Sequence, residues 1–445
     1  MRITYITAGA GGMYCGSCIR DNALAAALMA RGHDVSLLPL YTPTLVDEEN
    51  VSANRVFWNG ISAYLEQHVP LFRHTPWALD RLWEAPWLIR ALAGRLVSMR
   101  PEKVADLTVS MLEGQHGYQA KEIEKLVHWL KGQPKPDVID MSNSMLIAVA
   151  RPLKEALGTP VCCTLQGEDV FLGNLDESHR TRALQLIAQH APYVDRFLAV
   201  SDYCAGHMSR TLNIPGAKID VVPLGINVDG YERPARATDA TFTIGYFGRI
   251  APEKGLHLLC DAYHRLRASG RLDSGRIALA GYLAPEDAKY LDSILEQARQ
   301  WGLGSEVTYH GGLDLERKVD FLNTLDVFAA PAVYDDPKGL PLLEAMALGV
   351  PVVAPRRGTY TEFLERTGGG LLVPPDDVDA FAEALATLAA DPDRRRDLGT
   401  RGAEGVRARY TAEAMADRAL DIYRSLASGA TSPAAERLSP ALASL

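Results

Sequence analysis

The amino-acid sequence predicts an α/β protein made of two successive Rossmann-like domains, each with a parallel β-sheet covered by helices. The chain of 445 residues is longer than one hydrophobic core ordinarily organises, and it suits two domains of about 200 residues each. Short apolar stretches alternate with helix-forming stretches, and this alternation restarts after a break near the middle of the chain. Strands that alternate with helices build parallel sheets with both faces covered.

The first forty residues are expected to form a βαβ unit. Residues 3–6 are a short apolar strand, and a glycine-rich turn follows at 9–12. Residues 22–31 are strong helix formers, and Gly32 comes next, at the position where glycine commonly ends a helix. A second strand at 34–40 completes the unit and begins the first sheet.

The same alternation continues through both halves of the chain. In the first half we expect strands at 137–141, 160–167, 196–201 and 220–226. After a linker at 232–241, we expect strands at 242–250, 276–282, 306–312, 325–331 and 351–355. The patterns predict a first domain over 1–232 with a helical insertion around 70–130, a second domain over 241–411, a helix over 412–427 that packs back on the first domain, and a disordered tail over 428–445.

Composition and charge argue against several classes of protein. Hydrophobic residues make up 47% of the chain and charged residues 23%, which is ordinary for a globular protein. The formal net charge of −9, with no basic run, argues against a nucleic-acid partner. We see no signal-peptide pattern and no apolar stretch of about 20 residues, and we expect the six cysteines to be reduced thiols in the cytoplasm.

One stretch, residues 70–112, departs from the βαβ alternation. It combines Trp77, Trp83 and Trp87 with several leucines, and its basic residues outnumber its acidic ones. We favour a helical hairpin packed on its own domain, because helices of this composition more often face a core. The alternative is an insertion that shapes an acceptor cleft or rests on a membrane, which would make 70–100 a peripheral contact with the inner face of the membrane.

The glycine turn at 9–12 could let the backbone approach a phosphate at the start of the following helix. It is not a dinucleotide fingerprint, because Tyr14 stands where the third glycine belongs and no acidic residue follows the second strand. A nicotinamide cofactor is therefore disfavoured, and Gly11 and Gly12 are kept as candidate contacts to a phosphate group.

A second candidate site is the loop Gly-Arg-Ile-Ala-Pro-Glu-Lys-Gly at 248–255. Arg249 and Lys254 follow a strand at the sheet edge where ligands bind in open α/β folds. Two cations there, beside Gly248, could neutralise a diphosphate. Taken as an isolated pair, the two cations would be better interpreted as solvated surface charges.

The third candidate site begins at Asp336 and leads into a helix. Gly339 precedes this helix, whose free backbone N–H groups and dipole favour an anion. Glu344 lies one turn into the helix and could accept hydrogen bonds from a ribose diol, while Asp336 could accept from sugar hydroxyls. Either acid alone could be a routine surface charge. The candidate donor contacts at this helix start are Gly339, Leu340, Pro341 and Leu342.

Together these residues resemble the retaining glycosyltransferases of family 4. That family carries a Glu-x7-Glu motif with a glycine three residues after the first acid, then a helix and Gly-x-Pro-Val-Val. Here Asp336, Gly339 and Glu344 keep the spacing, and residues 349–353 read Gly-Val-Pro-Val-Val. The phosphate-binding arginine and lysine of the family match Arg249 and Lys254. The resemblance covers nearly the whole chain and is weakest from 45 to 135.

The resemblance implies a GT-B architecture, with two Rossmann-like domains facing a central cleft. It implies that 1–232 binds an acceptor and that 241–411 binds a nucleotide-sugar donor, with retention of configuration and without a metal or other cofactor. Arg249 and Lys254 would hold the diphosphate, Glu344 the ribose and Asp336 the transferred sugar. The acceptor, the base and the sugar are not identified.

The chain departs from the family pattern at two places. Asp336 is one methylene shorter than the usual glutamate, and Lys338 replaces an aromatic residue. Where many members carry His-Gly after a strand of the first domain, this chain has Gln-Gly-Glu-Asp. Glutamine is not protonated, so it can act only through hydrogen bonds. The candidates on the acceptor or sugar side are Gln166, Glu168 and Asp169.

Two short motifs admit competing interpretations. Asp377-Val378-Asp379 has the spacing of manganese-dependent transferases, but it follows two prolines and opens a helix, which favours capping. Cys15 and Cys18 have redox-motif spacing without the further ligands that zinc needs. We favour the interpretation that these two cysteines are simply small residues that line a cleft. The alternative is that they form a regulatory disulfide.

Three other functions use similar parts. A nucleotide-sugar epimerase would convert a donor without an acceptor, and a sugar phosphorylase would use free phosphate and a cofactor whose lysine motif we do not find. A non-catalytic sugar-nucleotide binding protein would fit the departures at Asp336 and Gln166. Release of nucleoside diphosphate only when an acceptor is present would separate a transferase from all three.

Overall fold

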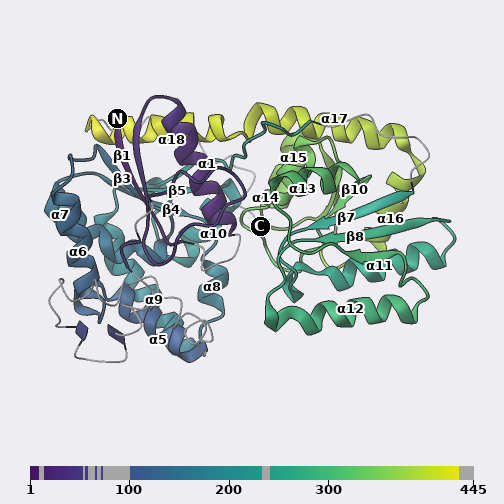
Figure 1. The fold of residues 1–445 in the computed structure, drawn as a ribbon, viewed down its shortest axis with the longest axis horizontal. Coiled ribbons are helices and arrows are strands. Elements are labelled where there is room, and N and C mark those ends of the chain that lie inside the picture. The colour runs from purple at the N-terminus through teal and green to yellow at the C-terminus, as the bar shows by residue number, and fades with distance from the viewer. Residues whose placement is uncertain are drawn as a thin grey trace. The chain divides into compact units, whose positions relative to one another are not determined.

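The structure, a computed structural model, describes residues 1–9, 15–53, 56–58, 66–67, 72–73, 101–232 and 241–429. The chain divides into two compact units, which are coloured in chain order in Figure 1. Unit 1 comprises residues 1–222 and the C-terminal residues from Met415, and unit 2 comprises Pro223–Ala414. Most of the tryptophan-rich stretch, the linker from 233 to 240 and the tail from 430 lie outside the described residues.

Unit 1 contains a six-stranded parallel sheet with the order β2-β1-β3-β4-β5-β6. Every residue of β3 and β4 is buried, as expected for central strands covered on both faces. The strands are β1 Arg2–Thr7, β2 Asp34–Pro39, β3 Val138–Met141, β4 Val161–Leu165, β5 Arg196–Ala199 and β6 Ile219–Val221.

Helices follow the strands of unit 1, and some begin at side-chain caps. Ser201, for example, starts α10 because its hydroxyl accepts a hydrogen bond of 3.0 Å from the backbone N–H of Cys204. The α-helices of this part of the chain are α1 Gly16–Ala30, α5 Pro101–Leu112, α6 Ala120–Lys131, α7 Ala150–Leu157, α8 Asp169–Gly173, α9 Glu177–His190 and α10 Asp202–Thr211. Short 3-10 helices lie at Gly114–His116, Ser144–Val149, Ala191–Tyr193 and Gly216–Lys218.

Helix α18, Ala412–Ala427, joins unit 1 although it comes from the end of the described chain. The Tyr423 hydroxyl donates a hydrogen bond of 2.5 Å to Asp140 on β3, and both side chains are buried. Arg31, at the end of α1, lies 2.6 Å from Asp417 on α18, and Figure 1 shows α18 beside α1. The helix therefore completes the core of a sheet whose strands lie far earlier in the sequence.

Unit 2 contains a second six-stranded parallel sheet, with the order β12-β11-β10-β7-β8-β9. The two sheets confirm the predicted fold class. The strands are β7 Phe242–Phe247, β8 Gly275–Ala280, β9 Val307–Tyr309, β10 Val327–Ala329, β11 Val352–Pro355 and β12 Gly370–Val373. The α-helices are α11 Leu256–Ala268, α12 Ala288–Gln300, α13 Leu315–Asn323, α14 Leu340–Ala347, α15 Gly358–Thr367, α16 Val378–Ala390 and α17 Pro392–Arg409, with 3-10 helices at Pro252–Lys254 and Pro285–Asp287.

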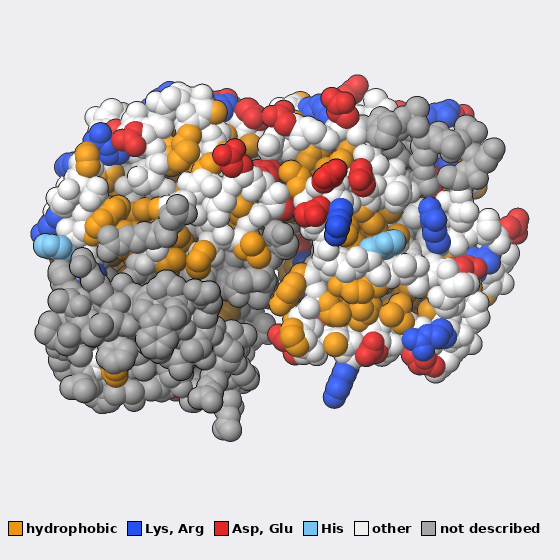
Figure 2. All heavy atoms as spheres, viewed as in Figure 1, with side chains coloured by type: hydrophobic (Ala, Val, Ile, Leu, Met, Phe, Trp, Pro, Cys, Tyr) orange, Lys and Arg blue, Asp and Glu red, His pale blue; other side chains and the backbone are white. Residues whose placement is uncertain are grey.

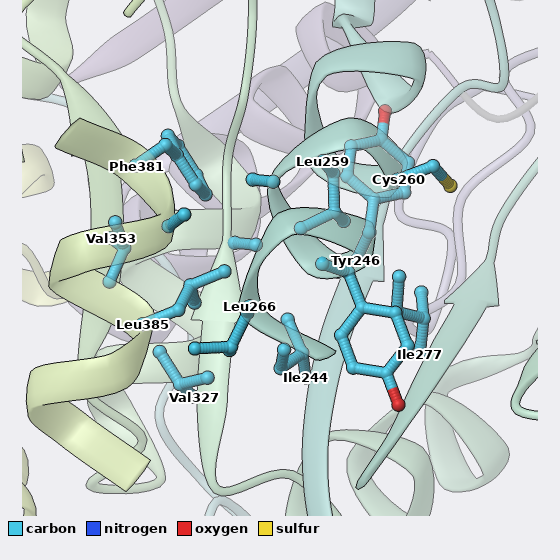
Figure 3. Close-up of a cluster of buried hydrophobic side chains, with 14 of the residues drawn as sticks. Ile244, Tyr246, Leu259, Cys260, Leu266, Ile277, Val327, Val353, Phe381 and Leu385 are labelled. Carbon is cyan, nitrogen blue, oxygen red and sulfur yellow. The ribbon is translucent and has the colours of Figure 1, made fainter. Parts of the chain in front are cut away.

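The core of unit 2 fixes the strands that carry the candidate site. Figure 3 shows Ile244, Val327 and Val353, from three neighbouring strands, packed against side chains of α11 and α16. All three are fully buried. Because close-packed interiors resist displacement, the loops after β7 and β10 start from fixed positions.

On the face shown in Figure 2, acidic and basic side chains are interspersed over the described residues of unit 2. Among the residues that the structure describes, we find no helix that is both long enough and apolar enough to cross a bilayer.

Candidate functional site

The loop after β7 is shaped by glycines that lie close to neighbouring backbone. Gly248 follows β7, and a Cβ on Gly281 would lie 1.9 Å from the Gly248 carbonyl oxygen. Gly255, with φ of +74°, starts α11, and a Cβ there would lie 2.0 Å from the carbonyl oxygen of Pro331. These two close approaches press the loop against the residues that follow β8 and β10, and so place Lys254 beside the segment after β10.

Lys254 forms an ion pair with Asp336 in this position. Its ammonium nitrogen lies 2.8 Å from Asp336 Oδ2 and 4.7 Å from the centre of the Tyr334 ring, and it also hydrogen-bonds to the Tyr334 hydroxyl. The Lys254 side chain is 19% exposed and that of Asp336 is 8% exposed. The structure thus joins two residues that the sequence could relate only through a family pattern.

Asp336 is surrounded by hydrogen-bond donors. Its Oδ2 accepts from Tyr334 at 2.7 Å and from Tyr360 at 3.1 Å, besides Lys254. Its Oδ1 accepts from the backbone N–H groups of Lys338 at 3.0 Å and Gly339 at 3.2 Å. Burial alone would raise the pKa of Asp336, but Lys254 and the other donors outweigh it and hold the pKa well below its usual range. Asp336 therefore remains ionised and ties Lys254 to the start of α14.

Helix α14 begins at Gly339, whose φ of +63° suits glycine. The first residues of the helix are Leu340, Pro341 and Leu342, and the backbone N–H of Leu342 donates to the Gly339 carbonyl at 3.0 Å. Proline in the first turn costs no helical hydrogen bond, because a backbone N–H at that position would have no partner inside the helix. The segment presents the positive end of the helix dipole next to the Lys254–Asp336 pair.

Glu344 lies in a second buried ion pair, which the sequence analysis did not identify. Lys318 on α13 places its ammonium nitrogen 2.6 Å from Glu344 Oε1, and the Tyr231 hydroxyl lies 3.4 Å from the same oxygen. Lys318 is 2% exposed and Glu344 is 5% exposed. Spacing could have indicated Lys318, since it shares a helical face with the buried Phe321 and Leu322.

Arg249, which was expected beside Lys254, is held by acidic side chains. Its guanidinium is paired with Glu253, and another of its nitrogens lies 3.6 Å from Asp287 Oδ2. The Arg249 side chain is 42% exposed, so these pairs contribute little to stability. The Tyr246 hydroxyl donates to the Arg249 carbonyl at 2.7 Å and fixes the backbone of the loop rather than the guanidinium.

Unit 1 carries a separate polar cluster where β3 and β4 end. Gln166 donates from Nε2 to Asp21 Oδ1 at 2.9 Å and to the Ser142 carbonyl at 2.8 Å. Both partners are acceptors, so the orientation of the amide is determined and its Oε1 faces away from them. Oε1 has no hydrogen-bond partner in the described part of the chain, although Gln166 is only 2% exposed.

Glu168 and Asp169 hold the loop that follows Gln166. The Glu168 carboxylate accepts from the backbone N–H of Ser144 at 2.7 Å and from that of Gln166 at 2.8 Å, and so bridges the loops after β3 and β4. Asp169 Oδ2 lies 3.0 Å from Nε2 of His207 on α10. Of the predicted phosphate contacts in unit 1, Gly11 and Gly12 lie outside the described residues.

Asp21 is the centre of the polar cluster in unit 1. It accepts hydrogen bonds of 2.9 Å from both Tyr5 and Thr7, besides Gln166, and it lies 3.3 Å from Arg20. Burial raises its pKa, against the lowering effect of the Arg20 charge and of these donors. Asp21 was not predicted from the sequence, because nothing in a helical segment indicates that an acid will be fully buried.

We expect the substitution Asp140→Asn to change how stability depends on pH. Burial raises the pKa of Asp140 to about 6, although Tyr423 donates a hydrogen bond to it. A carboxyl whose pKa is raised by folding contributes its full stability below its unfolded pKa of about 4 and loses that contribution as pH rises through about 6. Urea unfolding at several pH values should show the variant gaining stability relative to the parent over this window. A difference that is constant with pH would contradict the raised pKa.

The possible metal motif is used for structure. Asp377 accepts a hydrogen bond of 2.8 Å from the backbone N–H of Ala380 and so caps α16, while Asp379 pairs with Arg265. Within the described residues we find no group of three or more histidine, cysteine or acidic side chains placed to hold a metal ion.

Comparisons with known proteins match both parts of the chain to glycosyltransferases. Residues 232–405 match the family model of Glycosyl transferases group 1, and residues 20–225 match that of the Glycosyl transferase 4-like domain. The chain is similar to the GDP-mannose-dependent alpha-(1-6)-phosphatidylinositol monomannoside mannosyltransferase of Mycobacterium tuberculosis, at 29% identity over 241 residues, which are 51% of this chain and 60% of that protein. It is also similar to the D-inositol 3-phosphate glycosyltransferase of Segniliparus rotundus, at 28% identity over 75% of this chain and 73% of that protein.

Solved structures share the fold at lower identity. Sucrose-phosphate synthase from Thermosynechococcus elongatus superposes with a TM-score of 0.69 at 20% identity, over 97% of this chain and 100% of that chain. Anabaena HepE in complex with UDP superposes with a TM-score of 0.66 at 17% identity, over 96% of this chain and 100% of that chain. The two-sheet architecture is therefore common to these proteins, whereas the chain spans only about 60% of the length of the mycobacterial relative.

Proposed function

Because the chain belongs to the glycosyltransferases of family 4, we propose that it transfers a sugar from a nucleotide-diphosphate sugar to an acceptor, with retention of configuration and without a metal ion. The observation that carries this proposal is the Lys254–Asp336 ion pair at the start of α14. It provides a fixed cation beside the positive end of a helix, which is a site for a diphosphate that needs no bound metal.

The reaction requires stabilisation of the charge that develops on the leaving diphosphate. Lys254 and the positive end of the α14 dipole supply it, and Arg249 adds a second cation when it exchanges Glu253 and Asp287 for phosphate oxygens. Glu344 accepts hydrogen bonds from the ribose. The ionised carboxylate of Asp336 has two roles in this proposal. It holds Lys254 by the ion pair, and it orients the transferred sugar.

The polar cluster of unit 1 is the proposed acceptor or sugar side. Gln166 presents a carbonyl oxygen, and Glu168 and Asp169 are carboxylates, so these groups suit a ligand that donates hydroxyl protons. The named acceptors of the two relatives, a phosphatidylinositol monomannoside and D-inositol 3-phosphate, are both polyols. We therefore propose a polyhydroxyl acceptor.

A thermal-shift screen with UDP, GDP, ADP and their sugars tests the donor site. Ligand at about a hundredfold excess over Kd adds about 2.7 kcal/mol, which for a domain of this size raises Tm by about 5–10 °C. We expect one base to stabilise the protein, the chelator EDTA to have no effect, and Lys254→Gln to abolish the shift. Lys289→Gln, at an exposed lysine of unit 2, is the matched control.

The second stage measures release of nucleoside diphosphate with and without candidate polyol acceptors. Release that depends on an acceptor supports a transferase and excludes an epimerase. If none of the nucleotides shifts Tm, or if the shift survives in Lys254→Gln, the proposed donor site is wrong.

A further inference from the structure

Two cysteines lie together where α1 begins. Cys15 is the residue before the helix, with extended backbone angles of φ −114° and ψ 123°, and Cys18 is the third helical residue. Cys15 is half-buried, whereas Cys18 is 1% exposed. Residues three apart at a helix start face each other within the range that a disulfide can span.

A short series of contacts leads from this pair to the polar cluster of unit 1. Cys18 lies on α1 one turn before Asp21, and both side chains are buried. Thr7 donates to Asp21 Oδ2 at 2.9 Å, and Asp21 Oδ1 accepts from Gln166 at 2.9 Å. Thr7 and Asp21 are both buried, so water cannot substitute for a contact that is lost.

We propose that Cys15 and Cys18 form a reversible disulfide that lowers the transferase activity by disturbing the side chains that orient Gln166. The regulation rests on the proposed function, whereas the disulfide itself does not. Formation of the bond would bring the sulfurs to about 2.05 Å, closer than a hydrogen bond between thiols allows. This contraction strains the first turn of α1, and Asp21 lies one turn further along the same helix.

A small disulfide such as oxidised glutathione would supply the oxidising equivalents. Cys15 is the accessible sulfur and lies at the positive end of a helix, so its thiolate attacks one glutathione sulfur and releases the other half as glutathione thiolate. Cys18 is buried and cannot meet glutathione directly, so it acts second and gives up its proton as it attacks. Its sulfur attacks Cys15 Sγ, and the second glutathione leaves. Two protein thiols are oxidised, one glutathione disulfide is reduced, and the two thiol protons end on the two glutathiones.

The test begins with the full chain incubated with oxidised glutathione. We expect the number of titratable thiols in denaturant to fall from six to four, and mass spectrometry to find Cys15 joined to Cys18. Release of nucleoside diphosphate from UDP-glucose and from GDP-mannose, measured in parallel, should fall at least fivefold with the better donor. Dithiothreitol should restore both the thiols and the activity.

Two variants separate this pair from the other cysteines. Cys15→Ser keeps a residue that favours helix starts, so it should fold and become insensitive to oxidised glutathione. Cys260→Ser changes a buried cysteine of unit 2 and should remain as sensitive as the parent. Equal sensitivity of Cys15→Ser and the parent would overturn the assignment.

Hydrogen exchange over residues 160–172 provides a readout that needs no substrate. Oxidation should speed exchange around Gln166, because its backbone N–H bonds to Glu168 within the same loop. Six thiols after oxidation, or a disulfide that changes neither exchange nor activity, would overturn the inference. If the reduced protein releases no nucleotide from any donor, the proposed function fails, and the thiol count and hydrogen exchange still decide for or against the pair.

Discussion

Replacement of Lys254 by glutamine is expected to lower kcat/KM for sugar transfer by at least about a hundredfold. Removal of a single group that stabilises developing negative charge typically costs about 10²–10³ in rate. Here the loss has a second cause, because the Lys254 ammonium lies 2.8 Å from Asp336 Oδ2. Without it, Asp336 keeps only uncharged donors, and both the leaving diphosphate and the carboxylate lose their cation. Steady-state kinetics with the donor that the screen identifies will measure the effect.

A double variant separates the two causes. If the loss came only from the unbalanced charge on Asp336, Lys254→Gln combined with Asp336→Asn would recover activity. We expect the double variant to recover thermal stability but not kcat/KM, because the cation for the diphosphate is still missing. Activity within a few-fold of the parent in Lys254→Gln alone would contradict the diphosphate site.

The second large effect is expected at the buried pair formed by Lys318 and Glu344. Lys318→Met should remove most of the preference for a nucleoside diphosphate over its 2′,3′-dideoxy analogue, a change of about tenfold in the Kd ratio. The reason is that Lys318 holds Glu344 Oε1 at 2.6 Å and so sets the direction in which the carboxylate meets the ribose. A purely structural defect would weaken both nucleotides equally, so the ratio distinguishes orientation from folding. Calorimetric titration with both ligands provides the measurement.

Removal of one partner from a buried ion pair also costs about 3–5 kcal/mol of stability, so Lys318→Met must be compared with control variants. Lys318→Met combined with Glu344→Gln removes both charges and should restore Tm without restoring the ribose preference. Arg317→Met alters a neighbour on α13 whose side chain is 73% exposed, and it should change neither quantity. A Kd ratio in Lys318→Met equal to that of the parent would show that Lys318 does not orient Glu344.

The sequence predicted the two sheets because alternation of strands and helices is a local pattern. The strand predicted at 242–250 is β7, Phe242–Phe247, followed by the loop that carries Arg249 and Lys254. The strand predicted at 137–141 is β3, Val138–Met141. Spacing of apolar residues decides such elements within a few positions, so they needed no knowledge of distant contacts.

The partners of the site residues could not be predicted in the same way. Tyr360, which donates a hydrogen bond to Asp336, lies 24 residues from it in the sequence. Lys318 and Glu344 are 26 residues apart. A lysine in a helix is expected to be solvated, and only the apolar residues on the same face of α13 hint that it is not. Asp287, which lies near Arg249, comes from a 3-10 helix with no motif of its own.

The hydrogen bond from Tyr423 to Asp140 has a consequence for the order in which the protein is assembled on the ribosome. Asp140 emerges early, whereas its partner is translated only after the whole of unit 2. Until α18 leaves the exit tunnel, β3 carries a carboxyl that lacks this hydrogen bond and the packing of that helix. During synthesis, unit 2 can therefore complete its fold while unit 1 still lacks α18. Unit 1 is the first to begin synthesis and the last to complete its core.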